Sequence, residues 1–135
     1  SPQVMEQVRL LSNLETDQQK LIQIVLCGQP ELKARLARPD LRQLRQRITV
    51  RYHIPPLSLE DTAMYVRHRL WVAGSDGSVL FDPSAVREVY RYSKGGPRLI
   101  NAVCDNALLA GYVSRTRVID GRCIRQAIQQ LEGPN

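Results

Sequence analysis

A change of hydrophobic pattern at Pro55 and Pro56 constrains the fold more than any other feature of the sequence. Before these prolines lie two short apolar runs rich in β-branched residues, 22–27 and 48–54, each beside a helical pattern. Short runs of this kind, ended by glycine or proline, are typical of strands buried on both faces of a parallel sheet. We therefore predict an α/β part up to residue 54 and, from residue 55 onward, helices with no further strand.

Local signals predict four helices after the two prolines. Ser58 followed by Asp61 predicts a capping box, and Asp82 followed by Pro83 predicts an N-cap and a first helical residue. The predicted helices begin near residues 59, 83, 97 and 121, and their inward stripes include Leu59, Val66, Val89, Ile100, Val103, Ile124 and Leu131. Upstream, helices are predicted over 3–14 and between Pro30 and Ile48, with a restart at Pro39.

The upstream part looks incomplete, because two strands alone make a poor sheet. An amphipathic pattern also starts almost at Ser1, so we expect the chain to be a piece of a larger protein. Its three cysteines, Cys27, Cys104 and Cys123, show no C-x-x-C spacing, and neither histidine lies at helical spacing from them. We predict reduced, buried thiols and no metal site.

The net charge of +6 is concentrated in one segment. Residues 31–51 contain seven basic side chains and two acidic ones. Such a segment can meet nucleic acid, an acidic membrane surface or the phosphates of a nucleotide. The alternative is an ordinary solvated helix face.

Three polar residues are candidates for contact with a phosphate. Gln29 follows the first predicted strand, at the edge where ligands of open α/β sheets bind. Arg47 ends a predicted helix, from which a guanidinium can stabilise a phosphoryl group in transfer. Arg98 lies in the first turn of a predicted helix, where the macrodipole disfavours a cation unless an anionic partner is present. For each residue, the alternative is a surface side chain that contacts water.

The order of these segments resembles that of AAA+ ATPases. A predicted strand ends in Gly28 and Gln29, a helix leads to Q-R-I at 46–48, and G-G-P-R follows at 95–98 in the helical part. More specifically, the ExeA/GspA family associated with type II secretion has segments similar to QIVLCGQPEL, RPDLRQLRQRITVRYHIPPLS and GGPRLINAVCDNALL. The resemblance covers residues 2–132.

The resemblance implies a partial P-loop NTPase fold of the AAA+ type. Residues 1–54 would be the C-terminal remnant of the parallel-sheet nucleotide-binding domain, and residues 55–135 would be an all-α, four-helix lid. Gln29 would stand at the sensor-1 position and Arg98 would be the sensor-2 arginine, both binding nucleotide. Arg47 would be the catalytic arginine finger.

The resemblance also implies ATP and magnesium as ligands of the full-length protein. This chain contains no G-x-x-x-x-G-K-[S/T] motif, and its one Glu-Asp pair, Glu60-Asp61, opens a helix instead of ending a strand. We therefore expect the chain alone neither to hydrolyse ATP nor to bind it tightly.

The implied parent protein is a cytoplasmic ATPase at the inner face of the membrane, in type II secretion or pilus-type assembly. Its partners would be neighbouring copies of itself and a membrane-bound secretion protein. A second hypothesis is a DNA-associated ATPase resembling transposition accessory proteins, with weak nucleic-acid binding through residues 31–51. A third is a stand-alone helical interaction module without a nucleotide role.

Overall fold

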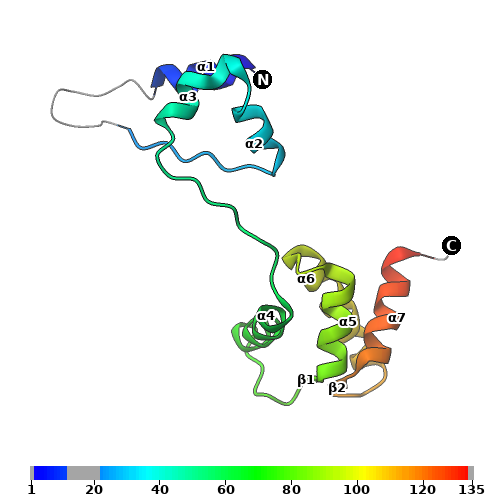
Figure 1. Ribbon diagram of the computed structural model, residues 1–135. Helices are drawn as coiled ribbons and strands as arrows, with labels where there is room; N and C mark the ends of the chain where they lie inside the picture. The colour runs from blue at the N-terminus through cyan, green and yellow to red at the C-terminus, as the bar shows by residue number, and fades with distance from the viewer. Residues whose placement is uncertain (1, 12–21, 134–135) are drawn as a thin grey trace. The chain divides into compact units, whose positions relative to one another are not determined.

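The computed structural model describes residues 2–11 and 22–133 (Figure 1). The chain divides into two compact units, Ser1–His53 and Ile54–Asn135. This division falls beside the boundary predicted at residues 54 and 55. That the units are a nucleotide-binding remnant and a lid stays a prediction.

The first unit consists of short helices around a small core. Its elements are α1 (Pro2–Leu11), α2 (Glu31–Leu36), the 3-10 turn η1 (Pro39–Leu41) and α3 (Arg42–Arg47). Leu41 and Leu44 are buried, and Arg9 of α1 donates a hydrogen bond of 3.1 Å to the side chain of Gln43 in α3. The helix predicted over 3–14 is confirmed as far as Leu11, and its remainder lies outside the described residues.

The two strands predicted in this unit do not form. Residues 22–27 and 48–54 have no regular secondary structure, so the prediction of a parallel-sheet remnant is wrong for the described part of the unit. The physical reason is that a strand needs the backbone hydrogen bonds of a neighbour, and two isolated strands gain too few. Their apolar side chains remain open to solvent: Val25, Val50 and Tyr52 are 76%, 81% and 85% exposed.

The second unit contains the four predicted helices within its described residues. They are α4 (Leu59–Val72), α5 (Pro83–Ser93), α6 (Pro97–Val113) and α7 (Gly121–Glu132). The predicted caps are confirmed: the Ser58 hydroxyl accepts from the Asp61 amide at 3.0 Å, and the Asp82 carboxylate accepts from the Ala85 amide at 2.7 Å. Asp120 caps α7 in the same way. Each cap satisfies amides that a helix start leaves without partners.

Helices α5, α6 and α7 pack on one another and enclose the core of this unit (Figure 1). The fully buried side chains with the largest volume are those of Val89, Ile100, Val103, Ile119, Ile124 and Thr62. Two residues predicted to face inward are partly exposed, Leu59 at 41% and Leu131 at 39%, because each lies at the end of its helix. The apolar stripes of the helices therefore meet as predicted except at these ends.

A short parallel strand pair also lies in the second unit, where no strand was predicted. Strand β1 (Leu80–Phe81) pairs with β2 (Val118–Ile119), and the Leu80 amide donates to the Arg117 carbonyl at 2.9 Å. Each strand has only two residues, which is too short for an alternating pattern to show in the sequence. The pair ties the loops before α5 and α7 together. The chain is thus α/β by content, but its described sheet lies within the helical unit.

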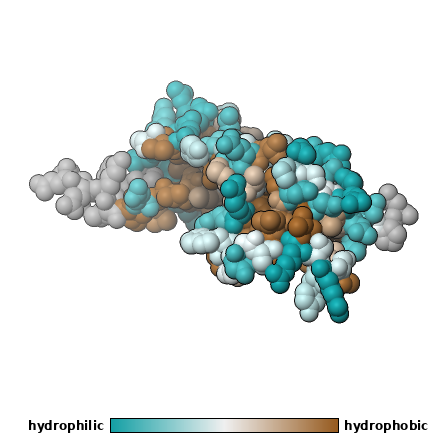
Figure 2. Space-filling model, turned by 90° about the horizontal axis from the view of Figure 1, so that it is seen from below, coloured by the Kyte–Doolittle hydropathy of each residue, from teal (hydrophilic) through white to brown (hydrophobic). Residues whose placement is uncertain are grey.

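The three cysteines are free of disulfides but not uniformly buried. Cys104 is buried, Cys123 is half-buried and Cys27 is exposed, so the prediction of a buried thiol is wrong at Cys27. The reason is that the strand predicted around Cys27 does not form, so no sheet covers this segment. Apolar residues also remain at the surface elsewhere, as brown patches among hydrophilic ones (Figure 2).

Candidate functional site

The turn between α5 and α6 carries the predicted phosphate-binding residue, Arg98. Helix α5 ends at Ser93; its C-cap Lys94 adopts the left-handed conformation (φ 51°, ψ 31°), and Gly95 follows with φ 79°. The Gly96 amide then donates to the Ser93 carbonyl at 2.9 Å, which closes the turn. The sequence S-K-G-G-P therefore reverses the chain within a few residues and starts α6 at Pro97.

This turn is attached to the segment that leads into α4. The Leu57 amide donates to the Gly95 carbonyl at 3.0 Å. A Cβ atom at Gly95 would lie only 2.0 Å from the Leu57 carbonyl oxygen, so the approach of the two backbones requires glycine. Because Ser58 caps α4 directly afterwards, the starts of α4 and α6 are held at the same end of the unit.

The start of α6 has the properties of an anion site. Gly96 is its N-cap and supplies no side-chain hydrogen bond to the first turn. The amides of Arg98 and Leu99 therefore face outward with the positive end of the helix dipole. Arg98 is exposed, and it makes no hydrogen bond or ion pair with other residues of the described part of the chain.

Lys94 adds a second exposed cation to this turn, and it is a residue that was not predicted from the sequence. Its signal in the sequence was its place directly before the two glycines of S-K-G-G-P-R. A cation on each side of Gly95 and Gly96, together with free amides, is an arrangement that suits a phosphate. The arginine on the preceding turn, Arg91, is already engaged in an ion pair with Glu88.

The other two predicted residues lie in the first unit. Gln29 is exposed, and its carbonyl accepts from the Leu32 amide at 2.8 Å at the entry to α2. Because no strand precedes Gln29, its predicted place at the edge of a sheet is wrong for this structure. Arg47 is exposed at the last position of α3, and the extended backbone of Ile48 ends the helix there (φ −79°, ψ 100°). Gln29 and Arg47 thus belong to the first unit, and Arg98 belongs to the second.

The basic segment 31–51 forms a largely exposed surface of α2, η1 and α3. Some of its charge is engaged locally: Arg38 pairs with Asp40 at 3.1 Å, and Arg51 donates to the Arg45 carbonyl at 2.9 Å. Two of its arginines are therefore partly occupied by contacts within the segment itself.

The described part of the chain lacks two kinds of feature. No group of three or more His, Cys, Asp or Glu side chains is gathered there as metal ligands would be. No described helix is long and apolar enough to cross a membrane.

Comparison with known proteins confirms the resemblance inferred from the motifs. The chain is 51% identical over 132 residues to General secretion pathway protein A of Aeromonas hydrophila. The match covers 98% of this chain but only 24% of that relative, so the chain spans about a quarter of its length. No family model matches the chain, and no solved structure matches it.

Proposed function

We propose that this chain is the sensor and lid portion of an AAA+ ATPase that couples ATP binding and hydrolysis to type II secretion or pilus-type assembly. The observation that carries the proposal is the exposed Arg98 in the uncapped first turn of α6, within a chain similar to General secretion pathway protein A. The proposed partners are neighbouring copies of the same ATPase and a membrane-bound secretion protein.

In the proposed mechanism, Arg98 and the first amides of α6 bind a phosphate of the nucleotide, and Lys94 adds a second positive charge. A cation is unfavourable at a helix start unless an anion compensates it, which is why phosphate stabilises this turn. Because the Gly95 carbonyl accepts a hydrogen bond from the Leu57 amide, a shift of the turn is transmitted to the start of α4. The bundle can thereby move as a unit with nucleotide state.

Arg47 and Gln29 have separate proposed roles. Arg47, at the exposed end of α3, is the arginine finger that stabilises charge on the phosphoryl group in a neighbouring subunit. Gln29 contacts the nucleotide at the sensor-1 position, a role that rests on the resemblance alone.

ATP supplies the phosphoryl group and its magnesium ion offsets the phosphate charge. The uncapped amides and exposed cations of the α5–α6 turn support the proposal that it binds a phosphate. The described residues do not fit the metal, since they present no cluster of ligands. We therefore assign no magnesium ligand to this chain.

The first experiment measures binding to the chain alone. Calorimetry with ATP and magnesium is expected to show no micromolar affinity, because the sequence contains no phosphate-binding loop. Micromolar binding or turnover above a buffer blank would show that these 135 residues are not merely the sensor and lid.

The second experiment uses the longer ATPase that contains this chain. Arg98→Ala and Arg47→Ala are both expected to lower turnover, the latter on the order of a thousandfold as for other missing arginine fingers. Arg122→Ala is the matched control, because Arg122 is an exposed arginine on α7 whose only assigned contact is with Asp120. Full activity in both test variants would return Arg98 and Arg47 to the role of solvated surface residues.

Mixing subunits separates the two roles. Each variant is combined with a subunit disabled in its own phosphate-binding loop. An Arg47 variant keeps an intact nucleotide site of its own. The disabled neighbour still has its Arg47 and can supply it to that site, so ATPase activity returns. An Arg98 variant is defective in its own site and is not rescued. Rescue of Arg98 but not of Arg47 would mean that the two roles are exchanged.

A further inference from the structure

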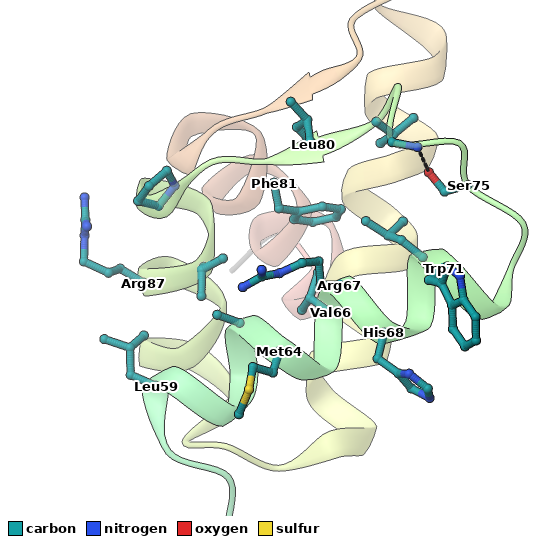
Figure 3. Close-up of a pocket in the computed structure, with 16 residues that line it drawn as sticks. Leu59, Met64, Val66, Arg67, His68, Trp71, Ser75, Leu80, Phe81 and Arg87 are labelled. Atoms are coloured by element: carbon teal, nitrogen blue, oxygen red, sulfur yellow. Dashed lines mark hydrogen bonds between the residues drawn. The ribbon is translucent and has the colours of Figure 1, made fainter.

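An open groove with an apolar lining runs along α4 in the second unit. It lies between α4, the segment 75–81 and the start of α5, and its volume is about 1030 Å³. Figure 3 shows Phe81 of β1 and Val66 of α4 directed toward its floor, with Leu59 at one end and Trp71 at the other. None of these residues belongs to the α5–α6 turn, so the groove is separate from the candidate phosphate site.

The rim of the groove exposes large apolar side chains. Met64 is 52% exposed, Leu80 57% and Trp71 71%. Scattered apolar residues are ordinary at a protein surface, but these three border one continuous hollow. Contiguous apolar surface of this kind marks a place where another molecule binds.

The charged residues of the groove all have the same sign. Arg67 and Arg87 line it, and within the described lining there is no aspartate or glutamate. Figure 3 shows Arg67 reaching from α4 into the groove, with Arg87 standing on the α5 side. Neither arginine forms an ion pair with another described residue. At the starts of the same helices, the Asp61 carboxylate accepts from Ser58 and the Asp82 carboxylate caps α5, while Glu60 of α4 lies outside the lining of the groove.

The size of the groove indicates what fits it. Its lining extends along α4 from Leu59 to Trp71, which is about 18 Å at the rise of an α-helix. Small-molecule pockets are mostly closed and reach roughly 1,000 Å³, whereas this hollow is long and open. A helix of three to four turns has the matching length and can insert residues at i, i+3 or i+4, and i+7. An added strand is disfavoured, because β1 offers an edge of only two residues.

We propose that this groove binds an acidic amphipathic helix of a partner protein. The apolar face of the helix contacts Phe81, Met64 and Trp71, and its flanking carboxylates pair with Arg67 and Arg87. Apolar contact supplies most of the stabilisation, and the two arginines select the sign of the partner's charge.

The experiment uses the full chain and two designed peptides. Both carry leucines at i, i+3, i+7 and i+10 of a helix; one has glutamates on the flanks and the other has lysines at the same positions. Trp71 is the sole tryptophan and lies beside His68, with ring centroids 5.8 Å apart. Its fluorescence therefore reports occupation of the groove, and calorimetry gives the affinity. The glutamate peptide is expected to bind at least tenfold more tightly than the lysine peptide.

A charge exchange tests whether the two arginines are responsible. The double variant Arg67→Glu, Arg87→Glu is expected to reverse the preference and bind the lysine peptide more tightly, which also shows that the variant is folded. Arg69→Glu, Arg122→Glu has the same net charge with both changes outside the groove, and it should keep the original preference.

Four results would overturn the proposal. The first is equal affinity for the two peptides, and the second is the same loss in both double variants. The third is a concentration-dependent dimer, seen by sedimentation, that Trp71→Ala dissociates; this would assign the groove to a second copy of the chain. The fourth is that neither peptide binds.

Discussion

Replacement of Gly95 by alanine tests the attachment between the α5–α6 turn and the segment before α4. Gly95 has φ 79°, and its added Cβ would lie 2.0 Å from the Leu57 carbonyl oxygen and 2.8 Å from the Leu57 nitrogen. These neighbours are backbone atoms, so no side chain can rotate away to make room. Leu57 must therefore shift by more than about 1 Å to restore an ordinary van der Waals contact.

The cost has three parts that can be estimated separately. The left-handed backbone costs an alanine about 1 kcal/mol relative to glycine. Loss of the hydrogen bond from the Leu57 amide to the Gly95 carbonyl costs about 1 kcal/mol. Partial withdrawal of the Leu57 side chain from the core against which it packs costs about 1 kcal/mol more. The free energy of unfolding of the second unit should therefore fall by roughly 3 kcal/mol, or about 12–24 °C in Tm.

Gly74→Ala is the matched control for backbone strain. Gly74 has φ 83°, but an added Cβ would meet nothing within 4 Å. It should cost only the conformational part, about 1 kcal/mol, or about 4–8 °C in Tm. Thermal and urea unfolding followed by far-ultraviolet circular dichroism measure both variants. If the two variants lose the same stability, the close approach of Leu57 to Gly95 is not present in solution.

Three further predictions concern groups of the second unit and one thiol of the first. Thr62→Val should raise stability by about 1 kcal/mol in urea unfolding, because the fully buried Thr62 hydroxyl has no hydrogen-bond partner among the described residues. Burial raises the pKa of the Cys104 thiol to about 12, so at pH 8 a thiol reagent should modify the exposed Cys27 well before Cys104; equal rates would contradict the packing of α6. Several hydrogen bonds to the Asp120 carboxylate, the largest contribution coming from the Cys123 amide, lower the pKa of Asp120 to about 2. The stabilisation of α7 by this carboxylate is therefore complete above about pH 4 and should be lost as the pH falls toward 2. Asp120→Asn should flatten that part of the profile of stability against pH.

The helices of the second unit could be predicted because their signals are local. Ser58, Asp82 and Asp120 each cap a helix through atoms within three residues, and all three caps form. Apolar spacing along each helix then determined which residues enter the core, apart from helix ends. Contacts between distant segments could not be found in this way. The glycines at 95 and 96 predicted a turn. Nothing in the sequence indicated that the Leu57 amide donates a hydrogen bond to this turn.

The candidate site was predictable only in part for the same reason. Arg98 could be placed in the first turn of a helix because Pro97 and the preceding glycines mark that start. Lys94 was missed, since its relevance depends on the left-handed turn that places it beside the same helix start. The groove along α4 was missed because it depends on how β1 packs relative to α4. Met64 and Trp71 have no distinguishing pattern in the sequence.

The two wrong strand predictions follow from what an apolar pattern measures. Residues 22–27 and 48–54 have the composition of buried strands, yet Val25, Val50 and Tyr52 are more than three-quarters exposed. Such a pattern indicates that burial of the segment's side chains is favourable. A strand also requires backbone hydrogen-bond partners on each side. Helix caps carry their partners within the same few residues, so α4 to α7 form from local information. The strands depend on neighbours, and the described part of the chain supplies none.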